Sequence, residues 1–223
     1  MKKYLIATAA LVLFSIPSLG AAATDRPGPY FTGFLGANFA TDTTVTFVGD
    51  TISDDDVTFD PGVYVGGTGG YDFGFVRLEG ELSYRHADLD TVTFADGRRF
   101  RNVDGDLGAF TGMFNAFFDL HNPSRVTPYL GGGIGFASLF LSDTDGRDTS
   151  GINEPLYSES DDTVFAYQIG AGMDIAINNR YSLDIGYRYL KTDKAELESD
   201  FNFTTNELRY ESHSAMVGFK FKF

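Results

Sequence analysis

The chain lacks cysteine altogether, and this absence excludes several classes of protein. Without a thiol there is no disulfide framework, no thiolate metal site and no lipoprotein-type lipid anchor. Long apolar segments are almost as scarce, because residues 4–16 are followed by no second run of similar length. A helical membrane protein needs about 20 apolar residues for each crossing of the bilayer. The sequence therefore excludes that class as well.

Positive charge is also in short supply. The chain has 17 Lys and Arg against 31 Asp and Glu, which gives a formal net charge of −14. Nucleic-acid binding requires a basic face, so we expect no nucleic-acid partner. The acidity does not indicate disorder, because 22 Phe and 12 Tyr supply a large and strongly patterned aromatic content.

The N-terminus has the pattern of a secretory signal peptide. A basic start at residues 1–3 precedes the apolar run 4–16, and Ala-Ala-Ala at residues 21–23 fits an A-x-A cleavage site. The run is too short to cross a bilayer as a helix. We therefore expect residues 1–23 to be removed after export through the Sec pathway, leaving residues 24–223 as a single barrel domain.

The C-terminal segment shows the clearest alternation in the chain. Residues 213–223 read His-Ser-Ala-Met-Val-Gly-Phe-Lys-Phe-Lys-Phe, so apolar side chains share one parity and polar or small ones the other. Consecutive side chains of a β-strand point to opposite faces. A strand with one apolar face that ends on an aromatic residue, Phe223, suits a transmembrane β-barrel with lipid outside and a polar lumen.

Seven further segments alternate in the same way, although three consecutive glycines blur the pattern in one of them. They are residues 30–39, 62–71, 75–86, 104–118, 126–139, 165–177 and 181–190. Short connections at residues 72–74, 119–125 and 178–180 alternate with long, acidic ones at residues 41–60, 87–103, 140–162 and 191–208. We expect an all-β fold: an eight-stranded antiparallel up-and-down transmembrane β-barrel with short periplasmic turns and long extracellular loops.

A soluble barrel of lipocalin type is the structural alternative, because alternation alone does not say which face meets water. The small residues on the polar face fit a narrow lumen, and the difference in loop length fits a membrane barrel. Both features, with the aromatic chain end, favour the membrane protein.

Three segments carry a resemblance to a known family. They are residues 127–135 (Thr-Pro-Tyr-Leu-Gly-Gly-Gly-Ile-Gly), 168–174 (Gln-Ile-Gly-Ala-Gly-Met-Asp) and 182–189 (Ser-Leu-Asp-Ile-Gly-Tyr-Arg-Tyr). With them, the chain resembles the small OmpA-like and opacity-type outer-membrane β-barrels over the whole of residues 24–223. The resemblance implies a surface antigen, adhesin or anchor in the outer membrane of a Gram-negative bacterium, in contact with lipid and lipopolysaccharide. It also implies that Phe219, Phe221 and Phe223 are read by the barrel-assembly machinery.

The strand positions that alternate with the apolar ones, and that should face the lumen, carry charges of both signs. They are Arg77, Glu79, Glu81, Arg85, Asp174, Asp184 and Arg188. Buried ionised groups are tolerated when they are paired, and the interior of an eight-stranded barrel is packed. We expect these residues to form an ion-pair network that fills and locks the lumen. A small diffusion channel is the alternative, and a constriction ring of one charge sign would indicate it.

The long connections hold most of the negative charge, and we expect them to face the exterior, where a host or matrix ligand would bind. Residues 143–148 resemble a calcium loop but fail the motif, because Arg147 occupies a ligand position and Asp148 replaces the required glycine. Arg98, Arg99 and Arg101 form a basic cluster that could bind lipopolysaccharide phosphates or offset neighbouring aspartates.

The sequence gives little support for an enzymatic function. Some small barrels modify lipid A with a His and a Ser two residues apart on the lipid face, but Ala215 stands at that position after His213, and Asp88 after His86. No Ser-His-acid set can be assembled on one face. We therefore expect no enzymatic activity, no cofactor, no specific metal site and a monomeric protein.

Overall fold

The computed structural model describes residues 27–41, 43–48, 53–93, 99–142, 144–147, 153–157, 160–198 and 205–223. These ranges contain thirteen strands of a single antiparallel sheet. The strands are β1 (Gly28–Ala40), β2 (Thr43–Val48), β3 (Ser53–Phe59), β4 (Gly62–Asp72), β5 (Val76–Thr93), β6 (Arg99–Asp104), β7 (Asp106–Asp119), β8 (Val126–Leu141), β9 (Thr144–Arg147), β10 (Asn153–Tyr157), β11 (Ser160–Ala176), β12 (Tyr181–Glu198) and β13 (Thr205–Lys222). No helix in the described ranges is long and apolar enough to cross a membrane.

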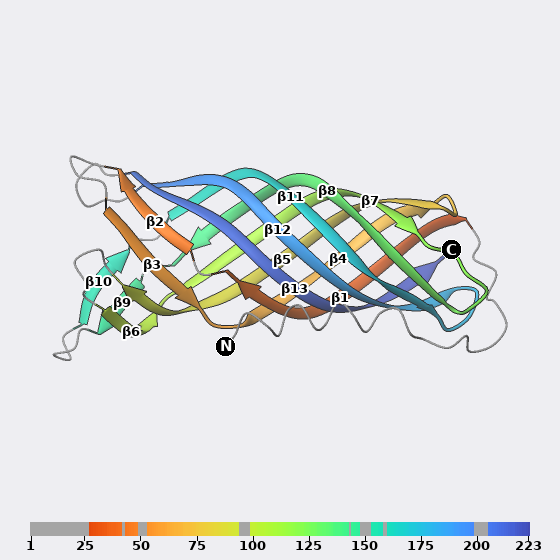
Figure 1. Ribbon diagram of the computed structural model, residues 1–223, viewed down its shortest axis with the longest axis horizontal. Coiled ribbons are helices and arrows are strands. Elements are labelled where there is room, and N and C mark those ends of the chain that lie inside the picture. The colour runs from red at the N-terminus through yellow and green to blue at the C-terminus, as the bar shows by residue number, and fades with distance from the viewer. Residues whose placement is uncertain are drawn as a thin grey trace.

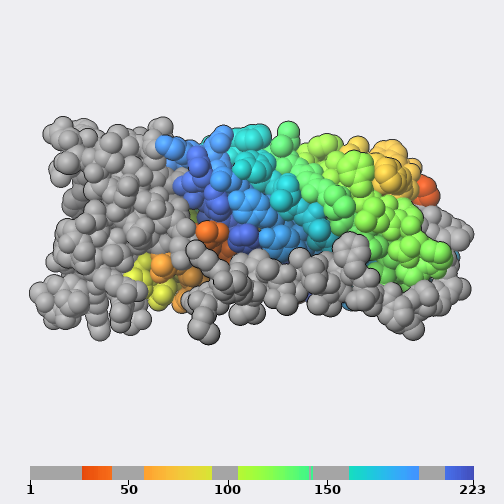
Figure 2. All heavy atoms as spheres, viewed as in Figure 1, coloured from red at the N-terminus to blue at the C-terminus, as the bar shows by residue number. Residues whose placement is uncertain are grey.

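Eight of these strands close into a barrel, which confirms the predicted fold (Figure 1). Around the wall, β1 pairs with β4, β4 with β5, β5 with β7, β7 with β8, β8 with β11, β11 with β12 and β12 with β13. The circle is completed where β13 pairs with β1, from Tyr30 opposite Lys222 to Ala40 opposite Ser212. Closure gives each strand of the wall a hydrogen-bonded neighbour on both sides, which a bilayer requires. Figure 2 shows β13, β12, β11 and β8 following one another around the visible wall as tilted bands from blue to green.

The side chains are arranged inside out relative to a soluble barrel. Apolar residues of the outer parity are exposed, for example Ile134 at 59% and Phe114 at 60%, whereas Arg85 on the inner parity is 0% exposed. A water-soluble barrel would show the reverse, so the apolar wall meets lipid. Residues 104–118 and the glycine-containing residues 126–139 also alternate: Phe114 and Ile134 point outward, and Asn115 points inward.

The glycine run of β8 has a packing reason on its inner parity. A Cβ atom on Gly133 would lie 2.0 Å from Oδ1 of Asn115, and one on Gly131 would lie 2.1 Å from the carbonyl oxygen of Ala116. Any side chain at these two positions would collide with the neighbouring strand β7. The glycines therefore bring the wall close enough for the residues of β7 to fill the lumen.

The two ends of the barrel differ. At one, the turn end, the strands are joined by short turns, and Gly74 adopts a φ of 95° that favours glycine. At the other, the extension end, segments that we expected to be loops contain strands: β2, β3, β6, β9 and β10 continue the sheet beyond the barrel, and β5, β12 and β13 extend toward them (Figure 1). The predicted long connections at this end therefore contain paired strands, which the alternation did not predict. Backbone pairing can continue past the bilayer, and an acidic composition does not prevent it.

In the extension end, two neighbouring strands of the wall, β11 and β12, separate before they end. The pairing of β11 with β12 stops at Ala166 opposite Thr192. Beyond that point, β11 continues along β8 as far as Ser160, and β12 continues along β13 as far as Glu198. Among the described residues, these two strand ends are each paired on one side only.

Candidate functional site: the barrel lumen and its outer face

The lumen is crossed by polar side chains in successive layers, and the layer at the turn end consists of ion pairs. Arg77 on β5 lies 2.8 Å from the carboxylate of Asp119 at the end of β7. Lys222 on β13 donates a hydrogen bond to Asp72 at the end of β4, at 3.0 Å. Lys220 on β13 bonds with Asp174 on β11 across the lumen. These pairs bring together the ends of five strands that are distant in sequence.

A second layer combines carboxylates with tyrosines. The hydroxyl of Tyr30 donates to Glu79 at 2.6 Å, and the hydroxyl of Tyr129 donates to Asp184 at 2.7 Å. Arg188 lies 3.9 Å from Glu79. The guanidinium of Arg77 stacks over the ring of Tyr129 at 4.6 Å, which adds a cation–π contact. Each carboxylate in this layer therefore has a partner of complementary chemistry.

Glu81 is the centre of the third layer and is 2% exposed. Its carboxylate accepts four hydrogen bonds, from the hydroxyls of Tyr64 (2.8 Å) and Ser83 (3.1 Å) and the amides of Asn115 (3.0 Å) and Gln168 (2.9 Å). Arg85 lies 3.9 Å from Glu81 and stacks over the ring of Tyr64 at 4.3 Å. A buried charge with this many partners holds the side chains of several strands in one arrangement.

Toward the extension end the buried side chains of the lumen become mainly apolar. A cluster of buried side chains fills it, here called the apolar cap: Leu89, Leu107, Ala109, Met113, Ala137, Leu139, Ala166, Leu190, Ala195 and Tyr210. Sequence reasoning missed this cluster because it assigned the segment around Leu89 and Ala195 to loops. The available signal was that the inner parity of several strands changes from polar to apolar near their ends.

The predicted lumen residues all lie on the inner parity, but several have partners that the prediction did not name. Glu79 with Arg188 and Glu81 with Arg85 join predicted residues to each other. Arg77 pairs instead with Asp119, and Asp184 with the hydroxyl of Tyr129. Asp174 pairs with Lys220, which the prediction did not include and which is 1% exposed. The lumen tyrosines Tyr30, Tyr64 and Tyr129 were not predicted to take part.

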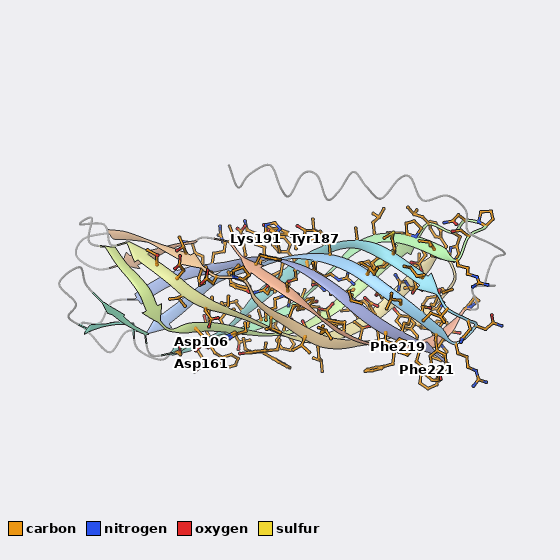
Figure 3. All side chains as sticks on the ribbon, turned by 90° about the horizontal axis from the view of Figure 1, so that it is seen from below. Asp106, Asp161, Tyr187, Lys191, Phe219 and Phe221 are labelled. Atoms are coloured by element: carbon orange, nitrogen blue, oxygen red, sulfur yellow. The ribbon has the colours of Figure 1, made fainter. Side chains whose placement is uncertain are left out.

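Aromatic residues form girdles on the outer wall, and Figure 3 labels Phe219 and Phe221 in one of them and Tyr187 in the other. Near the turn end, the ring of Tyr181 packs against Phe219 and Phe221 at 5.5 and 5.4 Å, and Phe223 is 78% exposed beside them. Nearer the extension end, the hydroxyl of Tyr187 bonds with Nδ1 of His213 at 2.6 Å. These positions suit amphipathic rings at the two membrane interfaces. The role of the C-terminal phenylalanines in assembly stays a prediction.

Charged groups on the outer wall begin beyond the second girdle. Lys191 lies 2.5 Å from Glu211, and its hydrogen bond holds the pKa of Glu211 below the usual value. Elsewhere around the wall, His86 lies 3.3 Å from Asp88 and 3.7 Å from Asp106. Figure 3 places Asp106 and Asp161 near each other on the side of the barrel opposite Lys191 and Tyr187. The apolar band therefore ends at this level.

Two sequence expectations about ligands fall on parts that the structure does not describe. Arg98 and the side chains of Arg99 and Arg101 lie outside the described residues, as do the side chains of residues 143–148. Within the described ranges, no group of three or more His, Cys, Asp or Glu could hold a metal ion. Ser214, the residue next to His213, points into the lumen and donates a hydrogen bond to Asn38 at 3.1 Å, away from His213.

Comparison with known proteins agrees with this geometry. Residues 6–223 match the family model described as outer membrane protein beta-barrel domain. Outer membrane protein PagN of Salmonella typhimurium is 27% identical over 228 residues, which covers 91% of this chain and 93% of PagN. The crystal structure of OprG from Pseudomonas aeruginosa superposes with a TM-score of 0.56 at 16% identity, covering 89% of this chain and 97% of OprG. Neisserial surface protein A gives 0.50 at 18% identity, covering 88% and 99%. At such identities the two structures show the fold alone.

The apolar wall, the girdles and the family match together place the protein in the outer membrane of a Gram-negative bacterium. The turn end is then the periplasmic end, and the extension end is extracellular. The chain belongs to the outer membrane protein β-barrel domain family.

Proposed function

We propose that the protein is a surface-display barrel, whose membrane part is a closed scaffold and whose extracellular extension carries the binding surface. The observation that carries this proposal is the filled lumen. Three polar layers and the apolar cap follow one another along the barrel axis, and side chains from every layer are buried. An eight-stranded barrel is just wide enough for side chains to fill it.

The energetics of the lumen favour a scaffold over a diffusion channel. Separating a buried ion pair by removing a partner costs about 3–5 kcal/mol. If opening a layer costs as much, the open state is populated in roughly one molecule in 150 to one in 5,000. The polar layers also carry both charge signs, whereas a selective pore is expected to present a ring of one sign.

The extracellular extension is the part of the molecule that remains available for partners. Its strands β2, β3, β6, β9 and β10 project the sheet beyond the apolar band. Loops and hairpins on a rigid scaffold can vary without loss of the fold, because they contribute little to the buried core. The name of Neisserial surface protein A, a protein of the same fold, is in keeping with a surface role.

Trimming the extension tests the proposal. Replacing residues 43–59, which include β2 and β3, by a short turn should leave a heat-modifiable barrel in the outer membrane and remove adhesion to host cells or matrix. The matched control is Asn179→Ser in a periplasmic turn, which should keep both properties. Full adhesion by the trimmed protein would contradict the display function.

Planar-bilayer recording tests the closed scaffold separately. The refolded protein should give no stable single-channel steps at neutral pH. Reproducible steps would favour the diffusion channel. The proposal also includes no enzymatic activity, so lipid A from cells that express the protein should have an unchanged mass spectrum. A deacylated species that depends on His213 would contradict this part.

A further inference from the structure

The periplasmic mouth of the lumen contains a pocket that the display function does not use. It lies between the ends of β4, β5, β7, β11 and β13 and the two turns that follow β7 and β11. Seven charged residues line it: Asp72, Arg77, Asp119, Arg125, Asp174, Lys220 and Lys222. Ser124, Asn178, Asn179 and Ser182 also line the pocket and add polar side chains to it.

The charges of this lining do not cancel. Each of the three aspartates already has a cationic partner, since Asp119 pairs with Arg77, Asp72 with Lys222 and Asp174 with Lys220. Arg125, from the turn after β7, is the fourth cation and is exposed. The lining therefore carries one positive charge in excess, which attracts a group with a single negative charge.

One buried donor in the pocket is unsatisfied. Arg77 is 3% exposed, and its Nε bonds with Asp119, but its Nη2 has no hydrogen-bond partner among the described residues. A buried guanidinium nitrogen without an acceptor is costly, because it has lost water and gained nothing in return. The guanidinium is fixed by its bond to Asp119 and by stacking on Tyr129 at 4.6 Å, so this side chain, which lines the pocket, is held in place.

We propose that this pocket is a binding site for one oxyanion group, a phosphate or a carboxylate, presented from the periplasmic side. Arg77 would donate from Nη2 to an oxygen of the anion, and Arg125 would contribute charge from the pocket rim. Guanidinium groups suit this role, because they bind planar or tetrahedral oxyanions with directed hydrogen bonds. Two sources carry this chemistry at the inner face of an outer membrane: the phosphate of a lipid headgroup and a free periplasmic anion.

The test uses the full chain refolded in maltoside micelles, which contain no phosphate. Inorganic phosphate is titrated at constant ionic strength and followed by calorimetry and by NMR of ¹⁵N-labelled arginine side chains. We expect saturable binding with a shift of the Arg77 signal, loss of binding in Arg77→Lys, which keeps the charge beside Asp119, and at least threefold weaker binding in Arg125→Gln. Arg180→Gln is the matched control: Arg180 is an exposed cation in a turn at the same end and does not line the pocket, so binding should stay within twofold.

The results separate the sources and can overturn the site. A shift of the Arg77 signal in phosphatidylglycerol nanodiscs without added phosphate identifies a lipid headgroup, whereas a shift that needs added phosphate or acetate identifies a free anion. An Arg77 signal that phosphate, acetate and lipid all leave unchanged would mean that water satisfies Nη2, and the proposal would be wrong. Equal losses in Arg125→Gln and Arg180→Gln would also overturn it, because they would show non-specific attraction to the turn end. Arg125→Gln, at an exposed position, keeps the test decisive if Arg77→Lys does not fold.

Discussion

The three polar layers near the turn end and the apolar cap near the extension end fill the same barrel with different kinds of side chain. In the polar layers, buried charges such as Glu81 and Arg85 are held by hydrogen bonds and ion pairs, and each side chain depends on the position of the others. The apolar cap contains leucines that are 0–1% exposed and that need only close packing, namely Leu107, Leu139 and Leu190. A charged layer specifies one arrangement of the strands, whereas an apolar layer stabilises any arrangement that fills the space. The barrel thus has its most specific interactions within the membrane and soluble-type packing toward the extracellular end.

The largest effect should come from breaking the charged layer. Glu81→Ala leaves Arg85 buried beside four donors that have lost their acceptor, so we expect unfolding to become easier by about 3–5 kcal/mol. Urea unfolding of the refolded protein in micelles measures this change. Glu211→Gln is the control, because it alters a carboxylate of a pair on the outer wall, for which about 0–1 kcal/mol is expected. Similar losses in both variants would mean that the buried layer has no special role.

The apolar cap should respond through lost volume. Leu139→Ala is expected to cost about 2–5 kcal/mol, depending on how far the neighbouring side chains move into the cavity. The same urea experiment applies, with Ile134→Ala as the control: Ile134 lies on the same strand but faces lipid, so its truncation leaves no internal cavity. A larger loss for Ile134→Ala would show that the cluster is not a packed core.

Conductance separates the two regions as barriers. Because the charged layers and the apolar cap lie in series, neither Glu81→Ala nor Leu139→Ala alone should conduct in a planar bilayer. The double variant should show brief openings, since both barriers are weakened. Steady conduction by Leu139→Ala alone would show that the apolar cap blocks ion flow and that the charged layers do not.

The smallest effect concerns the outer wall. The pKa of Glu211 is lowered by its hydrogen bond from Lys191, so the folded state favours the ionised carboxylate. Its contribution to stability is therefore present above the ordinary pKa of about 4.3 and is lost as the pH falls through the lowered folded value. NMR titration of Glu211 should show that Lys191→Gln moves the pKa back up. A pKa that this substitution leaves unchanged would rule out Lys191 as the cause.

The strands and their faces could be predicted because alternation records directly which side chains share a face. The partners across the lumen could not be predicted, because residues such as Lys220 and Asp174 come from strands that are not neighbours in the wall. Alternation gives the face of a residue and not its height along the axis, so Arg77 could not be matched with Asp119 in advance. The apolar cap was missed for a different reason: composition suggested loops where the strands in fact continue, and inner positions such as Leu89 and Ala195 were then not assigned to the interior.

The seam between β1 and β13 sets the order in which the molecule can be completed. It joins Tyr30 to Lys222, so the first barrel strand must wait for the last one to arrive. The entropic cost of closing so long a loop grows only slowly with its length, but contacts of this range make folding slow. Until the last strand arrives, both partner strands present unpaired backbone edges, which are prone to pair with other chains. Nascent chains of this protein therefore need protection from each other for as long as the circle remains open.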